Sequence, residues 1–338
     1  MKIAIVKLSA LGDIIHAMVV LQFIKKFNNE ILIDWIVEEN YKELFENNPN
    51  INKLHVVNIK KAKNRKSPLA LLKELNKVSN MGPYDLVVDM QGLIKSAIIS
   101  RLIPSKRTIG FDKNSLREGL ASVFYNEKFK CKYSKNVVIR NNELIQFSLG
   151  FFTDKDKLHS KSPFLFSRNN VFQGCEISNT LKNILIVPGA SNKLKQYPPN
   201  KLAELVNIID ANFLISWGTT EEKRVAEEIK NLAPRSSICN ELSLSMLVSL
   251  VSQMDLVIGP DTGPTHIAWA LNVPSVTIFG PTSGKRNSFI TDINKIIESD
   301  SKVNPNNLNK KDSSIKTISV NEIVKIANNL LNNQSINQ

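Results

Sequence analysis

Short runs rich in Ile and Val alternate with amphipathic segments along this chain, and the alternation occurs twice. In the first half the apolar runs are residues 2–7, 31–37, 54–57 and 85–89. The alternation restarts in the second half, with runs at 184–187, 213–217, 256–258 and 275–279. Strands separated by helices pair in parallel, because each helix carries the chain back across the sheet. The sequence therefore predicts two α/β halves, each built on a parallel sheet.

A polar stretch separates the two halves. Between residues 153 and 180 the pattern gives way to Ser, Asn, Lys and Asp, which is typical of a linker. A length of 338 residues also fits two domains of about 100–200 residues each. We therefore expect a first domain at 1–165, a second at 180–318, and a closing helix at 319–338 that either stays on the second domain or crosses back to the first.

The net charge of +13 is concentrated in one part of the chain. Residues 51–140 hold 19 basic and 6 acidic side chains, and 60–66 within them is expected to be a basic loop because it has no apolar period. This excess indicates an anionic partner: a nucleic acid, a membrane surface or a phosphorylated substrate. A solvated basic face without a partner is the alternative. Nucleic acid is the least favoured, because only 7% of residues are aromatic and no RNP-like or helix-turn-helix signature is present.

Cysteine spacing and hydropathy argue for a protein of the cytoplasm. Cys131, Cys175 and Cys239 are widely spaced and form no CxxC pair, which predicts three reduced thiols. Lys7 interrupts the first apolar run, and no run approaches the ~18 residues that a membrane span needs. We therefore expect neither a signal peptide nor a transmembrane helix.

Most motifs for bound cofactors are missing. The sequence has no GxxxxGK[ST], no GxGxxG after its first strand and no HExxH. Asp154 and Asp156 form a DxD, but it lies in the expected linker and follows no buried strand. We therefore expect a protein that needs no metal and no organic cofactor.

The loop after the first predicted strand ends in Asp13. Ligands of open parallel sheets bind beyond the carboxyl ends of the strands, which makes this loop a candidate site. Asp13 either caps the helix that follows it or acts as a general base, and His16 lies one helical turn further on. The sequence leaves both roles of Asp13 open.

Three loops of the second half suit a phosphorylated ligand. In GPDTGPTH at 259–266, Asp261, Thr262 and Gly263 stand between a strand and a helix, which directs backbone N–H groups at one point and favours phosphate binding over an ordinary turn. The loop 188–198 carries Ser191 and Lys195, which suit a diphosphate unless they are merely solvated. The pair Glu221-Glu222 offers a carboxylate to sugar hydroxyls or simply begins a helix.

These segments, in this order, resemble the ADP-heptose:lipopolysaccharide heptosyltransferases. The resemblance rests on IVKLSALGDIIH at 5–16, VVDMQGLIKSA at 87–97, LREGLASVFYN at 116–126 and DTGPTH at 261–266. It implies a GT-B fold, in which two Rossmann-like domains with parallel sheets face a central cleft. The segments at 87–97 and 116–126 favour the branch that adds the first heptose to Kdo–lipid A, and the branch that adds the second heptose is the alternative. A nucleotide-sugar epimerase of similar architecture is a more distant alternative.

The family implies inverting transfer from ADP-L-glycero-D-manno-heptose without a metal. On this sequence, Asp13 matches the general base and Lys195 the lysine that stabilises the departing ADP. The remaining donor-site positions are Ser191, Glu222 (with Glu221 as the alternative), Asp261, Thr262, Gly263 and His266.

The resemblance also implies an acceptor site in the first domain. Lys60, Lys61 and Lys63 match a basic loop that meets the phosphates of lipid A, and Arg117 matches another acceptor contact. Such a protein is expected at the cytoplasmic face of the inner membrane, bound peripherally to its anionic surface. Two positions depart from the family: Ala190 precedes Ser191 where two hydroxyl residues are common, and Asn142 replaces an arginine, with Arg140 the nearest substitute.

Overall fold

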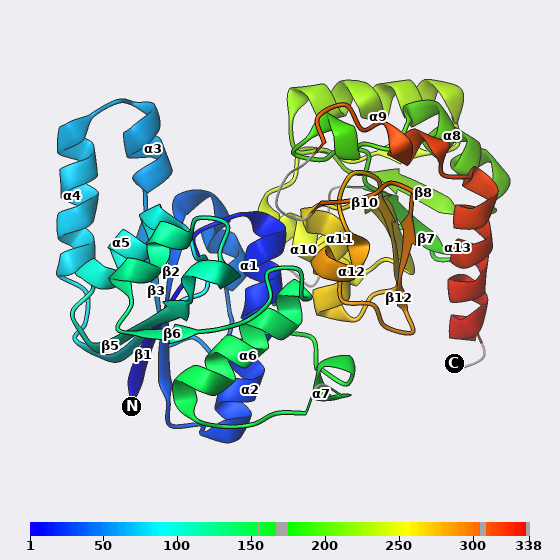
Figure 1. Ribbon diagram of the computed structural model, residues 1–338. Helices are drawn as coiled ribbons and strands as arrows, with labels where there is room; N and C mark the ends of the chain where they lie inside the picture. Colours follow the sequence, from blue (N-terminus) through cyan, green and yellow to red (C-terminus); the bar gives the residue numbers. More distant parts are fainter. Residues whose placement is uncertain (155, 167–174, 305–308, 336–338) are drawn as a thin grey trace. The chain divides into compact units, whose positions relative to one another are not determined.

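The computed structural model describes residues 1–154, 156–166, 175–304 and 309–335. The chain divides into two compact units, Met1–Phe164 and Leu165–Gln338 (Figure 1). Each unit is a six-stranded parallel sheet with helices, so the expected pair of Rossmann-like α/β domains is confirmed. In the described part of the chain no helix is both long and apolar enough to cross a membrane.

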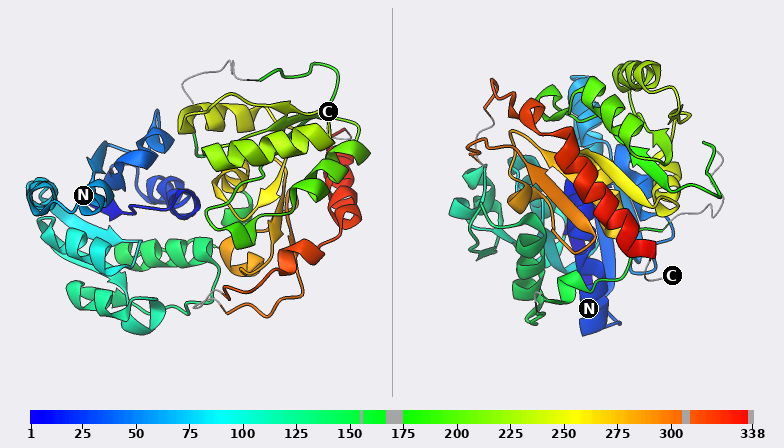
Figure 2. Two further views of the ribbon diagram at one scale, coloured as in Figure 1. Left: turned by 90° about the horizontal axis from the view of Figure 1, so that it is seen from above. Right: turned by 90° about the vertical axis from the view of Figure 1, so that its right-hand side faces the viewer.

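The sheet of the first unit has the strand order β3-β2-β1-β4-β5-β6. Ile5 of β1 lies between Trp35 of β2 and Val88 of β4, so β1 and β4 are central neighbours. Helices cover both faces of this sheet (Figure 2). The strands are β1 (Lys2–Val6), β2 (Leu32–Glu38), β3 (Lys53–Val57), β4 (Tyr84–Asp89), β5 (Ser105–Phe111) and β6 (Glu127–Phe129). The helices are α1 (Leu11–Met18), α2 (Val20–Phe27), α3 (Ile59–Asn64), α4 (Pro68–Ser79), α5 (Ile94–Leu102), α6 (Val137–Leu149) and α7 (Asp156–His159), with 3-10 turns η1 (Glu39–Phe45), η2 (Lys113–Ser115) and η3 (Gly119–Phe124).

The second unit repeats this topology. Its order β12-β11-β10-β7-β8-β9 again places the first and fourth strands of the unit side by side. The strands are β7 (Asn183–Ile186), β8 (Asn212–Ile215), β9 (Ser237–Ile238), β10 (Leu256–Pro260), β11 (Ser275–Phe279) and β12 (Asn294–Glu298). The helices are α8 (Pro199–Ile208), α9 (Thr220–Leu232), α10 (Leu244–Ser252), α11 (Gly263–Leu271), α12 (Gly284–Asn287) and α13 (Val320–Ser335), with 3-10 turns η4 (Lys193–Lys195) and η5 (Ser314–Thr317).

Each unit has an apolar core formed by alternate strand residues and the helices above them. In the first unit α3, α4 and α5 cover one sheet face, through residues such as Ile59, Val78 and Ile99. In the second unit α8, α9 and α13 share a core with one face of the sheet. The C-terminal helix α13 contributes Ile323 and Ala327 to this core, so it packs on the unit that contains the preceding strands.

The basic segment at 60–66 is mainly helical, so the expected loop is wrong there. Helix α3 spans Ile59–Asn64, and Ile59 and Ala62 bury one face of it three residues apart. The Glu38 carboxylate accepts a hydrogen bond from the Lys60 N–H at 3.0 Å and so satisfies a donor of the first turn. Two buried residues are too few to produce an apolar period in the sequence.

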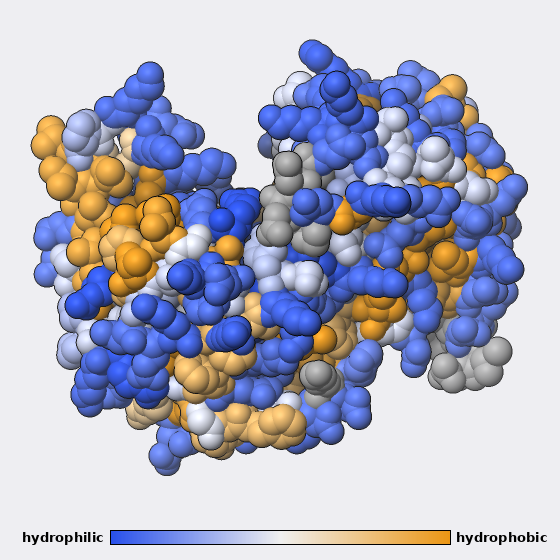
Figure 3. Space-filling view, viewed as in Figure 1, coloured by the Kyte–Doolittle hydropathy of each residue, from blue (hydrophilic) through white to orange (hydrophobic). Residues whose placement is uncertain are grey.

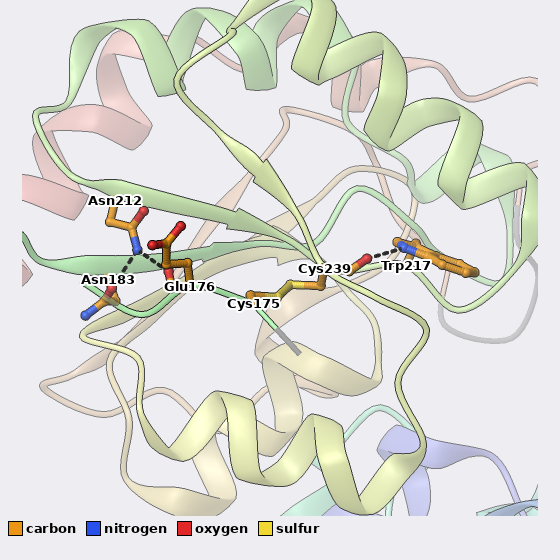
Figure 4. The surroundings of a disulfide bond; sticks show 6 residues. All are labelled: Cys175, Glu176, Asn183, Asn212, Trp217 and Cys239. Atoms are coloured by element: carbon orange, nitrogen blue, oxygen red, sulfur yellow. Dashed lines mark hydrogen bonds between the residues drawn. A yellow bond between two sulfur atoms is a disulfide. The ribbon is translucent and has the colours of Figure 1, made fainter. Parts of the chain in front are cut away.

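The prediction of three reduced thiols is also wrong. Cys175 and Cys239 form a disulfide with their Cα atoms 5.1 Å apart, although 64 residues separate them (Figure 4). The fold brings the segment before β7 beside the end of β9, where the Cys239 carbonyl accepts a hydrogen bond from Trp217 Nε1 at 2.7 Å. Cys131 is a buried free thiol. Sequence spacing does not show this pairing, because the contact depends on the order of the strands.

Candidate functional site

In both sheets the chain order reverses between the first and fourth strands of the unit. Ligands of such folds bind at this point, beyond the carboxyl ends of the strands. In the first unit the point lies between β1 and β4, and in the second between β7 and β10. The loops that follow these four strands carry most of the residues that the sequence analysis selected.

In the second unit an ion pair connects the two loops at the reversal point. Lys195 Nζ, at the end of η4, lies 2.6 Å from Asp261 Oδ2, directly after β10. The same carboxylate accepts a hydrogen bond from Thr282 Oγ1 at 3.1 Å, and its other oxygen lies 3.2 Å from His266 Nε2. The structure thus brings together three of the predicted donor-site residues, Lys195, Asp261 and His266.

The Asp261 carboxylate is buried and nevertheless ionised. Burial by itself raises the pKa of a carboxyl group. Here the hydrogen bond with His266 and the positive charge of Lys195 outweigh burial and hold the pKa of Asp261 well below its ordinary value. The result is a fixed negative acceptor that orients the Lys195 ammonium, which retains two further N–H donors for other partners.

The first turn of α11 points backbone donors at the same place. Thr262 is the N-cap residue, and its side chain makes no capping hydrogen bond. Within the described parts of the chain, no residue accepts from the N–H groups of Thr262 and Gly263. Thr265 Oγ1 donates to the Thr262 carbonyl at 2.7 Å and stabilises the turn. Open N–H groups at the positive end of a helix form an anion-binding site.

The structure distinguishes the two neighbouring glutamates. Glu222 Oε2 accepts from the Gly218 N–H at 2.8 Å, and its carboxylate lies so close over Gly189 that a Cβ there would be 2.1 Å from Oε1. Glu222 therefore sits at the carboxyl ends of β7 and β8. Glu221 instead pairs with Lys193 at 2.5 Å, an exposed ion pair. Ser191 is exposed on the loop between these groups.

In the first unit Asp13 is exposed and occupies the third position of α1. Its Oδ2 lies 3.5 Å from the Ala10 N–H, a long capping contact that leaves most of the carboxylate accessible. Burial, together with the charges of Glu38 and Asp13, raises the pKa of Tyr41, so these two carboxylates lie near the phenol. His16 is buried in α1. Both roles expected for Asp13, capping and proton transfer, are compatible with this position.

Two residues that the sequence analysis missed hold the loop before Asp13. Gln91 Oε1 accepts hydrogen bonds from the Leu8 N–H at 3.1 Å and the Ser9 N–H at 3.2 Å. Asp89, fully buried at the end of β4, accepts from the Gln91 N–H at 2.8 Å and from Tyr125 Oη at 2.8 Å. Burial raises the pKa of Asp89, and this effect exceeds the lowering by these hydrogen bonds. The position of Asp89, an acidic residue at the carboxyl end of an apolar run, could have indicated a buried carboxylate with a structural role.

The predicted acceptor residues are all solvent-exposed. Lys60, Lys61 and Lys63 project from α3, whose buried face consists of Ile59 and Ala62. Arg117 lies between η2 and η3, with its guanidinium 3.8 Å from Glu118. The structure records no contact that joins Arg117 to the three lysines, so they are separate basic elements of one unit.

Comparison with known proteins relates the chain to heptosyltransferases over nearly its whole length. Residues 69–317 match the family model described as glycosyltransferase family 9 (heptosyltransferase). The chain is 41% identical over 99% of its length to lipopolysaccharide heptosyltransferase 1 of Campylobacter coli, which it covers completely. It is 26% identical over 83% of its length to lipopolysaccharide heptosyltransferase 1 of Salmonella typhimurium, covering 89% of that protein.

Solved structures share the fold. The Escherichia coli heptosyltransferase WaaC with ADP superposes with a TM-score of 0.80 at 21% identity, covering 98% of this chain and 100% of that one. The Escherichia coli ADP-heptose lps heptosyltransferase II superposes with a TM-score of 0.71 at 18% identity, covering 99% and 100%. The expected GT-B fold class is therefore confirmed.

Proposed function

Because the chain belongs to glycosyltransferase family 9, the heptosyltransferases, we propose that it transfers L-glycero-D-manno-heptose from ADP-heptose to the Kdo of Kdo–lipid A. Heptosyl transfer in lipopolysaccharide synthesis is the activity of its relatives, and membership of this family sets the epimerase alternative aside. The first-heptose acceptor is supported by the 41% identity to a heptosyltransferase 1. Addition of the second heptose remains the alternative.

The observation that carries the proposal is the convergence of Lys195, Asp261 and the first turn of α11. A diphosphate at this turn would accept from the N–H groups of Thr262 and Gly263, and the Lys195 ammonium would face its oxygens. The charge on the diphosphate grows as its bond to the sugar breaks. A cation held in place by Asp261 therefore stabilises the transition state more than the bound substrate, and this is the role that a divalent ion has in other glycosyltransferases.

The other donor-site residues have assignments that follow from their positions. Asp261, which is ionised and buried, would also accept hydrogen bonds from heptose hydroxyls, with His266 fixing its orientation. Glu222 would meet the ribose, since its carboxylate lies at the ends of β7 and β8 while Glu221 pairs with Lys193. Ser191, exposed on the neighbouring loop, would contribute one hydroxyl to the diphosphate.

The reaction is a single displacement with Asp13 as base. The attacking Kdo hydroxyl gives its proton to the Asp13 carboxylate as its oxygen bonds to the anomeric carbon of heptose. The bond from that carbon to the diphosphate oxygen breaks, and ADP leaves with the electron pair. One displacement inverts the anomeric centre, and a positioned base typically contributes ~10²–10⁴-fold to the rate.

The acceptor is anionic, which matches the charge of the first unit. Lys60, Lys61, Lys63 and Arg117 would bind phosphates of lipid A as exposed cations. A lysine ammonium is a point charge without the bidentate fork of arginine, so this binding depends on charge more than on geometry. The same charge would hold the protein peripherally at the anionic cytoplasmic face of the inner membrane.

The deciding experiment measures ADP release from ADP-heptose in the presence of EDTA. Kdo–lipid A and heptosyl-Kdo–lipid A are offered in separate reactions. Turnover on Kdo–lipid A alone is the expected result, and it would support the acceptor and the metal-free mechanism together. Turnover on the heptosylated acceptor alone would retain the donor chemistry and assign the protein to the second-heptose reaction.

A further inference from the structure

Large apolar side chains are exposed on adjoining elements of the first unit. On α4, Leu69 is 80% exposed and Leu72 is 61% exposed; on η3, Leu120 is 71% exposed and Val123 is 66% exposed. Helix α5 contacts both α4 and η3, and its first residue, Ile94, is also exposed. We call these five residues the aliphatic patch. Figure 3 shows apolar side chains gathered over this part of the unit.

The core of the unit does not require the aliphatic patch. Helix α4 packs on the sheet through Leu71, Leu75 and Val78, which belong to the apolar core. Leu69 and Leu72, three residues apart, form a second apolar stripe that faces outward. In η3, Ala121 is buried against Tyr125 while its neighbour Leu120 is exposed. A contiguous exposed apolar patch on a folded unit marks an interaction site.

The segment of the chain that carries the aliphatic patch is rich in exposed cations. Residues 60–120 contain thirteen basic and five acidic side chains, and all the basic ones except Arg107 are exposed. Asp89 is buried and the other acidic ones are partly exposed, up to 35% of the Asp85 side chain and 37% of the Glu118 side chain. Each accepts a hydrogen bond within the unit: Glu74 from Asn58, Asp85 from Lys2, Asp89 from Gln91, Asp112 from Ser115 and Glu118 from Ile94. The exposed charge of this segment is therefore predominantly positive and favours an anionic partner over a basic one.

We propose that the aliphatic patch docks on the surface of an anionic lipid bilayer and inserts its side chains among the acyl chains. The inference rests on the proposed function for its biological setting, and it adds a mode of attachment that the charge of the unit does not predict. Apolar side chains that enter the headgroup boundary and cations that meet anionic headgroups are the two attractions that hold a protein on a bilayer. The cations come from Lys60, Lys61 and Lys63 of α3, which precede the patch in the chain, and from Arg117, which lies directly before η3.

The test is cosedimentation of the full chain with vesicles of phosphatidylcholine and phosphatidylglycerol. Because salt screens charge but not apolar burial, a substantial fraction should remain bound when salt is raised from about 0.1 M to about 0.5 M. The variant Leu72→Ser/Leu120→Ser should bind the vesicles about tenfold or more weakly, since each side chain buries apolar surface in the bilayer. The matched control is Ile208→Ser/Leu232→Ser in the second unit, where the native side chains are 48% and 49% exposed, and it should bind like the unmodified protein.

Three results would overturn the proposal. The first is equal vesicle binding by Leu72→Ser/Leu120→Ser and the unmodified protein. The second is complete release at the higher salt concentration, which would leave charge as the only attraction. The third is a self-associated form of the unmodified protein that the double variant loses, which would make the patch an interface between two copies of this chain.

A separate measurement distinguishes failure of this proposal from failure of the proposed function. ADP release is measured without vesicles on a deacylated, water-soluble Kdo acceptor. Leu72→Ser/Leu120→Ser should match the unmodified protein here, which also shows that the variant is folded. Absence of ADP release by the unmodified protein would refute the heptosyl transfer and leave the vesicle result standing.

Discussion

Lys195 Nζ and Asp261 Oδ2 lie 2.6 Å apart although 66 residues separate them in the sequence. The contact joins the loop after β7 to the loop after β10, the two central neighbours of the second sheet. In the first unit Gln91 Oε1 similarly joins the loop after β4 to the Leu8 and Ser9 N–H groups after β1. In both units, therefore, a polar side chain fixes the two loops at the point where chain order reverses.

The variant Asp261→Asn tests the ion pair. The change leaves Lys195 and His266 without their buried anionic partner and should lower the free energy of unfolding by about 3 kcal/mol at neutral pH. Because the pKa of Asp261 is lowered in the folded state, its stabilising contribution is full above the ordinary Asp pKa and is lost as pH falls through the lowered value. The difference between the two proteins, measured by denaturant unfolding, should therefore shrink on acidification. A difference that is constant with pH would show that Asp261 does not stabilise the fold through its charge.

The variant Lys195→Ala tests the stabilisation of the leaving group. We expect kcat for ADP release to fall on the order of 10²–10³-fold with a smaller change in the KM for ADP-heptose, because the charge on the diphosphate grows in the transition state. Lys193→Ala is the matched control, since Lys193 lies on the same loop and pairs with Glu221 at the surface. A proportionate loss in both variants would indicate a general effect of loop charge.

Eight of the twelve described strands could be predicted from the sequence, including the edge strand β3, and β5, β6, β9 and β12 could not. β1, β2, β4, β7, β10 and β11 are mainly apolar because helices cover both faces of the sheet. β6 and β9 have three and two residues, too few to show a pattern. β5 and β12 contain Lys106, Arg107 and Lys295, which interrupt the apolar runs. The number of strands in each sheet therefore could not be predicted from the sequence. The parallel pairing of the apolar strands could be.

The candidate site could be predicted where one loop carries it. The DTGPTH loop places Asp261, Thr262, Gly263 and His266 within six residues, and they stay together in the fold. Contacts between residues on different strands and loops leave no pattern in any one segment of the sequence, so they could not be predicted. Which of Glu221 and Glu222 faces the ends of β7 and β8 depends on how α9 is rotated about its axis. The two hydrogen bonds accepted by Gln91 span 83 and 82 residues.

The variant Asp13→Asn separates capping from proton transfer. Asparagine retains an oxygen that can accept from the Ala10 N–H, so the helix start should survive. An amide cannot accept the Kdo proton, and kcat should fall on the order of 10²–10⁴-fold. Binding of ADP-heptose, measured by calorimetry, should stay within about twofold because Asp13 belongs to the first unit and the proposed donor site to the second. Near-normal turnover by Asp13→Asn would leave Asp13 as a capping residue only.

The variant Gln91→Met tests whether the loop before Asp13 must be held. Methionine has a similar volume but cannot accept the two backbone hydrogen bonds, so the base should be less well oriented and kcat should fall about tenfold or more. The KM for ADP-heptose should be unchanged, which a general loss of folding would not produce. Gln91→Glu keeps an acceptor oxygen and should recover part of the activity. Equal kcat values for Gln91→Met and the unmodified protein would exclude a positioning role.

The triple variant Lys60→Ala, Lys61→Ala, Lys63→Ala tests the acceptor assignment. These exposed lysines of α3 make no contact that the core requires, so the fold should persist. If each cation contributes about 1 kcal/mol to an anionic surface, the acceptor KM should rise on the order of 10- to 100-fold, with the ADP-heptose KM unchanged. Alanine at the exposed residues Lys302, Lys310 and Lys311 of the second unit removes the same charge and should leave the acceptor KM near its starting value. Because charge attraction weakens with salt, the effect of the α3 variant should diminish at high ionic strength. An acceptor KM that does not change would return α3 to a solvated basic face.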